Sequence, residues 1–144
     1  MRTVNSGVSL RLANLATWQL SQASARSHRV LHEHLAEEAA SGYDYRVLAA
    51  LGDLGPASQA DLGRAAVLDR RDVTHTVRDL HARELVTRRA DPSDGRQMLV
   101  ELTAAGISML RRLDLVLDEV QDEVLATLTL TQRRTLLDLL QRLS

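Results

Sequence analysis

Several residue types that carry specialised chemistry are absent or scarce in this chain of 144 residues. It contains no cysteine, lysine or phenylalanine, and only two tyrosines, one tryptophan and two prolines. The lack of cysteine excludes disulfides, thiolate zinc sites and thiol-based redox sensing. No run of about 18 apolar residues occurs, and no signal-peptide core follows residues 1–5, so we expect a cytoplasmic protein without a membrane partner. With so few aromatics, the core must consist mainly of Leu, Val and Ala, which suits interlocking helices.

The charge of the chain is nearly balanced overall but unevenly distributed. The formal net charge is −1. Residues 64–96 contain eight arginines against six acidic residues, whereas residues 114–123 contain five acidic residues and no basic one. The middle of the chain is therefore its cationic part, and arginine suits phosphates and guanine edges better than lysine does.

Apolar spacing and capping residues predict a mainly helical chain that forms one domain over residues 1–144. We expect helices over residues 9–39, about 45–51, 59–66, 70–83 and about 104–128, and a last helix that begins at the cap Thr131. Ser58 is a suitable N-cap for helix 59–66 and Asp69 for helix 70–83, with Asp72 in the position of the acid of a capping box. Two helices joined by so short a turn form a helix-turn-helix unit.

One β-hairpin interrupts this helical pattern. Residues 91–95 (DPSDG) have the composition of a turn, and residues 85–89 and 97–102 on either side have strand character. Two strands are only marginally stable alone, so the hairpin must lean on the helices. The predicted fold class is mainly α with a small antiparallel β-wing, that is, a winged helix-turn-helix with additional long helices.

The predicted helix 70–83 has two different faces. On a helical wheel, Val73, Val77 and Leu80 fall together and form the face that would join the core. The opposite face could enter a DNA major groove, where arginine can fork onto guanine and a threonine methyl can touch thymine. It carries Arg71, Thr74, His75 and Arg78. The alternative is a solvated face whose arginines pair with Asp69, Asp72 and Asp79.

The hairpin carries further arginines. Arg96 would reach a minor groove, which concentrates negative potential when it is narrow, and Asp94 would brace the turn or another arginine. The alternative is that Asp94 and Arg96 form only a surface pair, worth about 0–1 kcal/mol. Arg88 and Arg89 alternate in direction along the first strand, so we expect one to face phosphate and the other to pack on the body.

The hairpin and the helices before it resemble a known family. Asp94-x-Arg96, followed after five residues by Leu102-Thr103, resembles the DxRxxxxxLT signature of the MarR family, the multiple-antibiotic-resistance-type regulators. The resemblance is dense over residues 57–106, including Gly106 after the signature. Where relatives usually have glycine before the first wing strand, this chain has Glu84. Glycine there suits a left-handed helix cap, and another residue in that conformation costs about 1 kcal/mol.

The resemblance implies a homodimeric transcriptional regulator that binds a pseudo-palindromic operator in double-stranded DNA. We expect a repressor rather than an activator. Residues 43–103 would form the DNA-binding lobe, and residues 9–39 and 104–144 would form a helical dimerisation stem. The expected DNA contacts are Ser58, Gln59, Arg70, Arg71, Thr74, His75, Arg78, Arg88, Asp94 and Arg96. The expected dimer interface includes Leu12, Leu15, Leu136, Leu139, Leu140 and Leu143. No cofactor is expected.

Many relatives release DNA when a small aromatic or phenolic ligand binds between the lobe and the stem, and one stripe of the first helix fits such a role. Its members are Trp18, Gln22, Ala25, Arg29 and His32. Trp18 would wall a pocket and Arg29 would hold an anionic ligand, with Tyr43 and Tyr45 bordering the same cleft. The alternative is that Trp18 packs in the dimer stem while Arg29 and His32 are solvated.

Other functions find less support in the sequence. His28 and His32 share a helical face that could hold Zn²⁺, but His34 points elsewhere, so we predict no metal site. No nucleophile, base and orienting group occur at a recognisable spacing, so we do not expect an enzyme. One alternative stays open, namely a winged-helix module that binds protein and not DNA, which the low net charge would suit.

Overall fold

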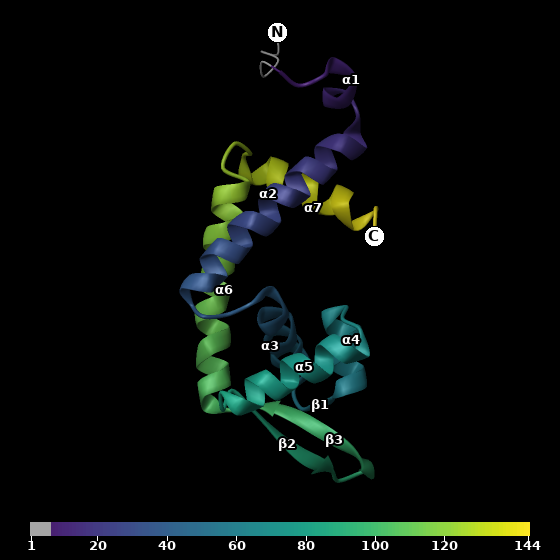
Figure 1. Ribbon diagram of the computed structural model, residues 1–144, viewed down its shortest axis with the longest axis vertical. Helices are drawn as coiled ribbons and strands as arrows, with labels where there is room; N and C mark the ends of the chain where they lie inside the picture. The colour runs from purple at the N-terminus through teal and green to yellow at the C-terminus, as the bar shows by residue number, and fades with distance from the viewer. Residues whose placement is uncertain (1–6) are drawn as a thin grey trace. The chain divides into compact units, whose positions relative to one another are not determined.

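The computed structural model describes residues 7–144, which form seven helices and one three-stranded sheet (Figure 1). It comprises two compact units, one formed by His34–Asp118 and the other by the residues before and after that segment. The elements are α1 (Leu10–Ala13), α2 (Ala16–Glu37), α3 (Gly42–Leu54), β1 (Ala57–Ser58), α4 (Gln59–Ala66), α5 (Arg70–Ala82), β2 (Val86–Asp91), β3 (Asp94–Leu102), α6 (Ala104–Val124) and α7 (Leu130–Gln141). The predicted fold class is confirmed. Within residues 7–144, no helix combines the length and apolar character that a membrane span requires.

The unit His34–Asp118 is built around a core of leucine and valine. Helices α3, α4 and α5 pack against one another, and α3, α4 and α5 each contact the sheet. Val73, Val77 and Leu80 are each at most 1 % exposed, which confirms the core face predicted for α5. The other side chains with almost no exposure are Leu35, Val47, Leu48, Leu51, Leu62, Val86, Val100 and Leu113.

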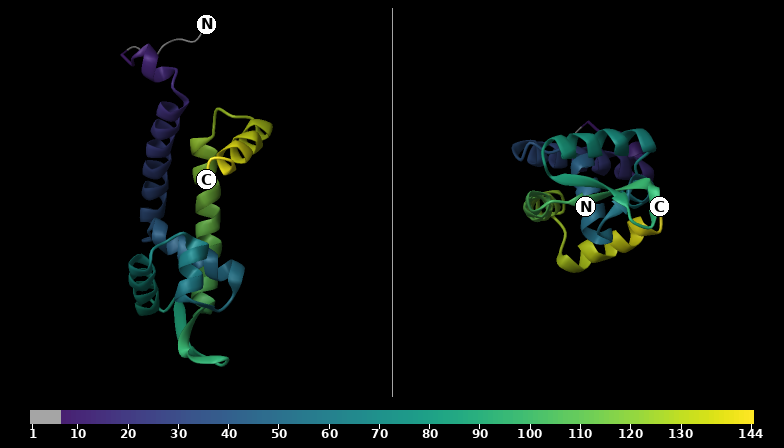
Figure 2. Two further views of the ribbon diagram at one scale, coloured as in Figure 1. Left: turned by 90° about the vertical axis from the view of Figure 1, so that its right-hand side faces the viewer. Right: turned by 90° about the horizontal axis from the view of Figure 1, so that it is seen from below.

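The sheet has the strand order β1-β3-β2 and is antiparallel. β2 and β3 form the predicted hairpin, whose outer part extends beyond α3, α4 and α5 (Figures 1 and 2). The sequence does not predict β1, in which Ala57 pairs with Val100 and Ser58 with Leu99. Two residues are too few to show an alternating pattern, so this strand is defined by its partner.

The helix predicted over residues 9–39 is interrupted near its start. α1 ends at Ala13 and α2 begins at Ala16. The side chain of Asn14 donates a hydrogen bond to the carbonyl oxygen of Leu10 at 2.8 Å. An asparagine that bonds a nearby carbonyl in this way competes with a continuous helix, so the prediction of one unbroken helix is wrong here.

The start of the last helix also differs from the prediction. Its cap is Thr129 and not Thr131, because Thr129 forms a capping box with Gln132. The Thr129 hydroxyl accepts from the Gln132 N–H at 3.2 Å, and the Gln132 side chain accepts from the Thr129 N–H at 2.9 Å. A cap at Thr131 would place Arg134, which cannot accept a hydrogen bond, in the returning position. The preceding helix accordingly ends at Val124, before the expected residue 128.

Candidate nucleic-acid interface

The outer face of α5 is rich in unpaired positive charge. The Asp69 carboxylate accepts from the N–H of Asp72 at 2.8 Å, which confirms the predicted N-cap. Among the described residues, no ion pair joins an arginine of this face to an acid, since Asp79 pairs with Arg83. A shallow hollow of about 580 Å³ lies over the face, lined by Arg70, Arg71, Thr74, His75 and Arg78. The face is therefore exposed and free of acidic partners among the described residues, so its arginines do not pair with Asp69, Asp72 or Asp79 as in the alternative interpretation.

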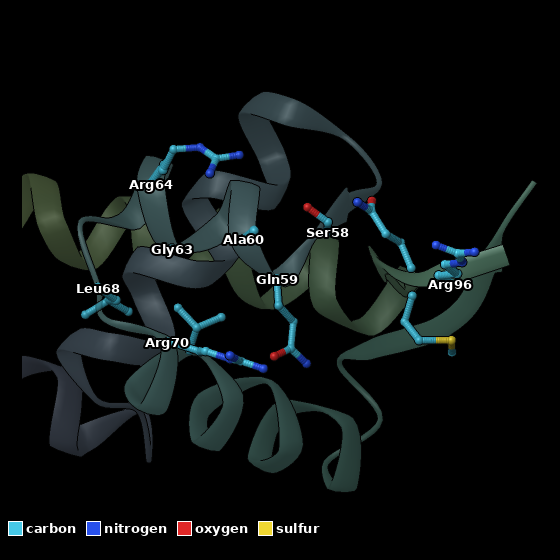
Figure 3. A pocket seen from close by; sticks show the side chains of 11 residues that line it. Ser58, Gln59, Ala60, Gly63, Arg64, Leu68, Arg70 and Arg96 are labelled. Atoms are coloured by element: carbon cyan, nitrogen blue, oxygen red, sulfur yellow. The ribbon is translucent and has the colours of Figure 1, made fainter. Parts of the chain in front are cut away.

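A second hollow, of about 680 Å³, lies between α4, α5 and β3 (Figure 3). Gln59 and Arg70 extend into it from the two helices, and Arg96 borders it from the strand. Arg64 also lines the hollow but is paired with Asp61 on its own helix. α4, α5 and the part of β3 next to the tip of the wing thus line one hollow, to which Arg70 and Arg96 contribute positive charge.

Ser58 borders this hollow without offering its hydroxyl. The residue is 8 % exposed, and its hydroxyl accepts from the N–H of Asp61 at 3.2 Å, which caps α4. The sequence correctly identifies Ser58 as the cap. Because the side chain is almost fully buried while it caps α4, we leave Ser58 out of the proposed DNA contacts.

The tip of the wing is held by two aspartates. The Asp94 carboxylate accepts from the backbone N–H of Arg96 at 3.1 Å, so it braces the turn and not another arginine side chain. The Asp91 carboxylate accepts from the N–H and the hydroxyl of Ser93 at 2.9 and 2.8 Å. These two hydrogen bonds hold the pKa of Asp91 below its usual value, and the bond from the backbone N–H of Ser93 has the larger effect. The Arg96 side chain is left exposed beside the braced turn.

Both arginines of β2 are exposed, so the expectation that one of them packs on the body is wrong. Arg89 donates from Nε to the Glu101 carboxylate of β3 at 3.3 Å, and both side chains are more than 40 % exposed. Arg88 has no such partner among the described residues. The reason is the projection of the hairpin, which carries both faces of β2 into solvent (Figure 2).

The turn of the helix-turn-helix is held by an arginine that the sequence analysis did not single out. Arg46 of α3 donates from Nε to the carbonyl oxygen of Ala66 at 2.8 Å and from its terminal nitrogen to that of Val67. Its guanidinium lies 5.7 Å from the centre of the Tyr43 ring. A cation at the C-terminal end of a helix is favourable, so Arg46 stabilises the end of α4 and its position relative to α3.

A second support joins the end of α5 to the start of α3. Asp44 is 7 % exposed and forms a capping box with Ser41, which starts α3 three residues before the expected position 45. Arg83 donates to Asp44, to Asp79 and to the carbonyl oxygen of Ala39, each at 3.1 Å. Partial burial alone would lower the pKa of Arg83, but the bonds to the two carboxylates outweigh it and the pKa is raised. The pattern Ser-x-x-Asp could have revealed the capping box, whereas nothing local indicates the contact with Arg83.

The residues predicted to bind an effector do not all behave alike. Trp18 is half-buried on α2, while Gln22, Arg29 and His32 are exposed. Tyr43 contacts Arg46, whereas the Tyr45 hydroxyl donates to Asp114 at 2.8 Å, so the two tyrosines face different sides of α3. The hollow of about 740 Å³ that α2 borders is lined by another face of that helix, with Leu20, Ala23, Ser24 and Ser27.

The leucines predicted to form a dimer interface are largely uncovered. Leu136 is half-buried, and Leu12, Leu15, Leu139, Leu140 and Leu143 are between 37 and 71 % exposed. They belong to α1, the α1–α2 junction and the C-terminal helix with the residues after it. Within residues 7–144, no three histidines or acidic residues cluster closely enough to bind a metal ion.

Comparisons with known proteins agree with this geometry. The model of the MarR family matches residues 41–97. The repressor NicR of Pseudomonas putida is 30 % identical over 124 residues, which cover 86 % of this chain and 78 % of NicR. The chain belongs to the MarR family. It is therefore a transcriptional regulator of the MarR type and not an enzyme, and the resemblance inferred from the signature is confirmed.

Solved structures of other transcriptional regulators have the same fold. A probable transcriptional regulator from Pseudomonas aeruginosa is 34 % identical, with a TM-score of 0.83 over 93 % of this chain and 100 % of that one. PcaV from Streptomyces coelicolor, in complex with its natural ligand, is 26 % identical, with a TM-score of 0.81 over 94 % of this chain and 96 % of PcaV. The similarity to this MarR-family fold thus extends beyond the wing signature to nearly the whole chain.

Proposed function

We propose that this MarR-family protein is a homodimeric repressor that binds a pseudo-palindromic operator through α5 and the wing. The observation that carries the proposal is the outer face of α5, where three arginines and His75 surround Thr74 without any acidic partner among the described residues. Such a face attracts an anionic partner, and the major groove is wide enough to admit one α-helix.

The contacts divide by chemistry. Arg71, Thr74, His75 and Arg78 would reach base edges, because they lie opposite the buried face of α5. Arg96 would enter the adjacent minor groove from a turn that Asp94 holds in place. Arg70 and Arg88 would contact phosphate, which supplies affinity without sequence information.

Dimerisation is supported by the apolar surface that the chain leaves uncovered in residues 7–33 and 119–144. Leu130, Leu139 and Leu143 are 76, 51 and 71 % exposed. Exposed apolar side chains gathered on one part of a chain can mark an interaction site. A two-fold dimer would cover it and would present two copies of α5 about one duplex turn apart.

A small aromatic or anionic effector would release the operator; the similar regulator PcaV was solved in complex with its natural ligand. Trp18 is the only tryptophan, so its fluorescence reports directly on a ligand that binds near Gln22, Arg29 or His32. Titration with a panel of aromatic carboxylates should change that emission and weaken DNA binding together. A change in DNA affinity without any change in emission would place the effector elsewhere.

The proposal is tested by selecting duplexes from a random pool with the full-length protein at low salt. We expect enrichment of one two-fold symmetric sequence, bound by two protomers. Failure to enrich any sequence, with no gel shift at low salt, would contradict the proposal and favour a winged module that binds protein.

A further inference from the structure

The helix that precedes the recognition helix contributes one side chain directly to it. The Thr74 hydroxyl of α5 donates to the amide oxygen of Gln59, the first residue of α4, at 3.0 Å. The carbonyl oxygen of Arg70 lies 2.8 Å from the same hydroxyl, so the two acceptors share its one proton. Gln59 is therefore fixed against the part of α5 that would read bases, 15 residues further along the chain.

The Gln59 amide keeps most of its hydrogen-bonding capacity. Its oxygen has a second lone pair, and among the described residues its nitrogen has no partner for either hydrogen. The side chain lines the hollow between α4, α5 and β3, where Arg70 and Arg96 also lie (Figure 3). The amide thus offers one acceptor and two donors to whatever occupies this hollow.

That combination matches one base better than it matches a phosphate. In the major groove adenine presents an acceptor, N7, beside a donor, the N6 amino group, and a glutamine amide can bond both. A phosphate oxygen only accepts, so it could pair with the amide nitrogen of Gln59 alone, whereas adenine can pair with both the nitrogen and the oxygen. We propose that Gln59 is a specificity-determining residue that reads an adenine, with Thr74 as its positioning residue. This inference rests on the proposed DNA-binding function.

The test uses the duplex selected with the wild-type protein and measures the affinity after each base-pair replacement in one half-site. At one A·T pair of the half-site, replacement by another base pair should weaken wild-type binding on the order of tenfold. Replacement of that adenine by unsubstituted purine, which lacks the N6 amino group, should weaken binding by a similar factor. Gln59→Ala should abolish this difference. Gln59→Glu should shift the preference to cytosine, whose amino group a carboxylate accepts.

Thr74 and a second glutamine supply the controls. Thr74→Val removes the hydroxyl at nearly constant shape and should weaken the adenine preference, whereas Thr74→Ser should preserve it. Gln97 lines the same hollow but has no bond to Thr74, so Gln97→Ala should leave the preference unchanged.

Two outcomes would overturn the inference, and they differ. If Gln59→Ala weakens binding equally for every base pair, or if the wild type does not distinguish adenine from purine, Gln59 does not read adenine although the protein binds DNA. If the wild-type protein selects no sequence, the proposed function itself fails and this inference falls with it.

Discussion

Gly106 shows how a single residue without a side chain can join two parts of the fold. A Cβ built on Gly106 would lie 2.0 Å from the carbonyl oxygen of Leu85, far inside van der Waals contact. The Thr103 hydroxyl donates to the Glu84 carbonyl at 2.8 Å and accepts from the Gly106 N–H at 3.0 Å. The Leu-Thr part of the signature therefore fastens the start of α6 to the start of the wing.

Replacement of Gly106 by alanine should destabilise the protein by about 3 kcal/mol, because a backbone atom must move to make room. The free energy of unfolding from urea denaturation measures this directly. Gly95→Ala is the matched control, since nothing lies within 4 Å of a Cβ there, and it should change stability by less than about 0.5 kcal/mol. Equal effects at the two glycines would contradict the close approach.

Tyr45 should titrate later than an ordinary tyrosine. Partial burial, then the hydrogen bond to Asp114 and the charge of that carboxylate, raises the pKa of Tyr45 from 10.0 to about 12. Since the folded state holds the proton more tightly, this contribution to stability is complete below pH 10 and is lost as the pH rises towards 12.

Tyr43→Phe leaves Tyr45 as the only tyrosine, so tyrosinate absorbance then follows this group alone. The midpoint should lie near pH 12 in the folded protein and should fall when Asp114→Asn is added. A midpoint near pH 10, with circular dichroism showing an intact fold, would contradict the contact with Asp114.

At the scale of elements, three helices end in a residue of left-handed conformation that is not glycine. Ala39, Val67 and Glu84 follow α2, α4 and α5 and have φ values of 52°, 54° and 59°. In each case the hydrogen bonds after the helix are those of a Schellman motif, which usually has glycine at this position. Glu84, the departure from the family pattern, therefore keeps the left-handed cap at a cost of about 1 kcal/mol.

The left-handed conformation costs the most free energy at Val67, because β-branched side chains are the least compatible with that region. It is 78 % exposed, so its side chain contributes little burial. Val67→Gly should raise the free energy of unfolding by about 1 kcal/mol. Ala65→Gly, two residues earlier on the exposed side of α4, should lower it by about 0.5–1 kcal/mol. A loss of stability in both variants would contradict the strain assigned to Val67.

The sequence predicts elements well where periodicity and a local cap agree, and poorly where a competing local bond decides. The helix-turn-helix and the hairpin follow from the caps Ser58 and Asp69 and from the turn at residues 91–95. The break at Asn14 and the cap at Thr129 depend on which of several competing local hydrogen bonds forms. The apolar periodicity of the sequence does not indicate this. A two-residue strand such as β1 exists only through its tertiary partner.

For the whole molecule, the exposed arginine face of α5 could be read from a helical wheel, but its supports could not. Arg46, Arg83 and the bond between Gln59 and Thr74 link residues distant in sequence, so they appear only once the chain is folded. The exposure of Arg89 likewise depends on how far the hairpin projects.

The uncovered leucines lead to a prediction about assembly. Leu139→Glu on α7 should weaken the dimer by about 2 kcal/mol or more, because it would bury a charge in the interface. Leu54→Glu on α3 is the control, since both leucines are 51 % exposed. Sedimentation over a concentration series should show dissociation for the first variant only. If Leu139→Glu remains as dimeric as the wild type, the interface lies elsewhere.

The most direct measurement of the central claim is the affinity of the wild type, Arg78→Ala and Arg96→Ala for the selected duplex and for an unrelated one, over a series of salt concentrations. Wild-type affinity should fall steeply with salt as counterions are released. Arg78→Ala should lose about 1–3 kcal/mol on the selected duplex alone, whereas Arg96→Ala should weaken both duplexes similarly. Wild-type affinity in both variants at every salt concentration would contradict the assignment of α5 and the wing as the DNA-binding surface.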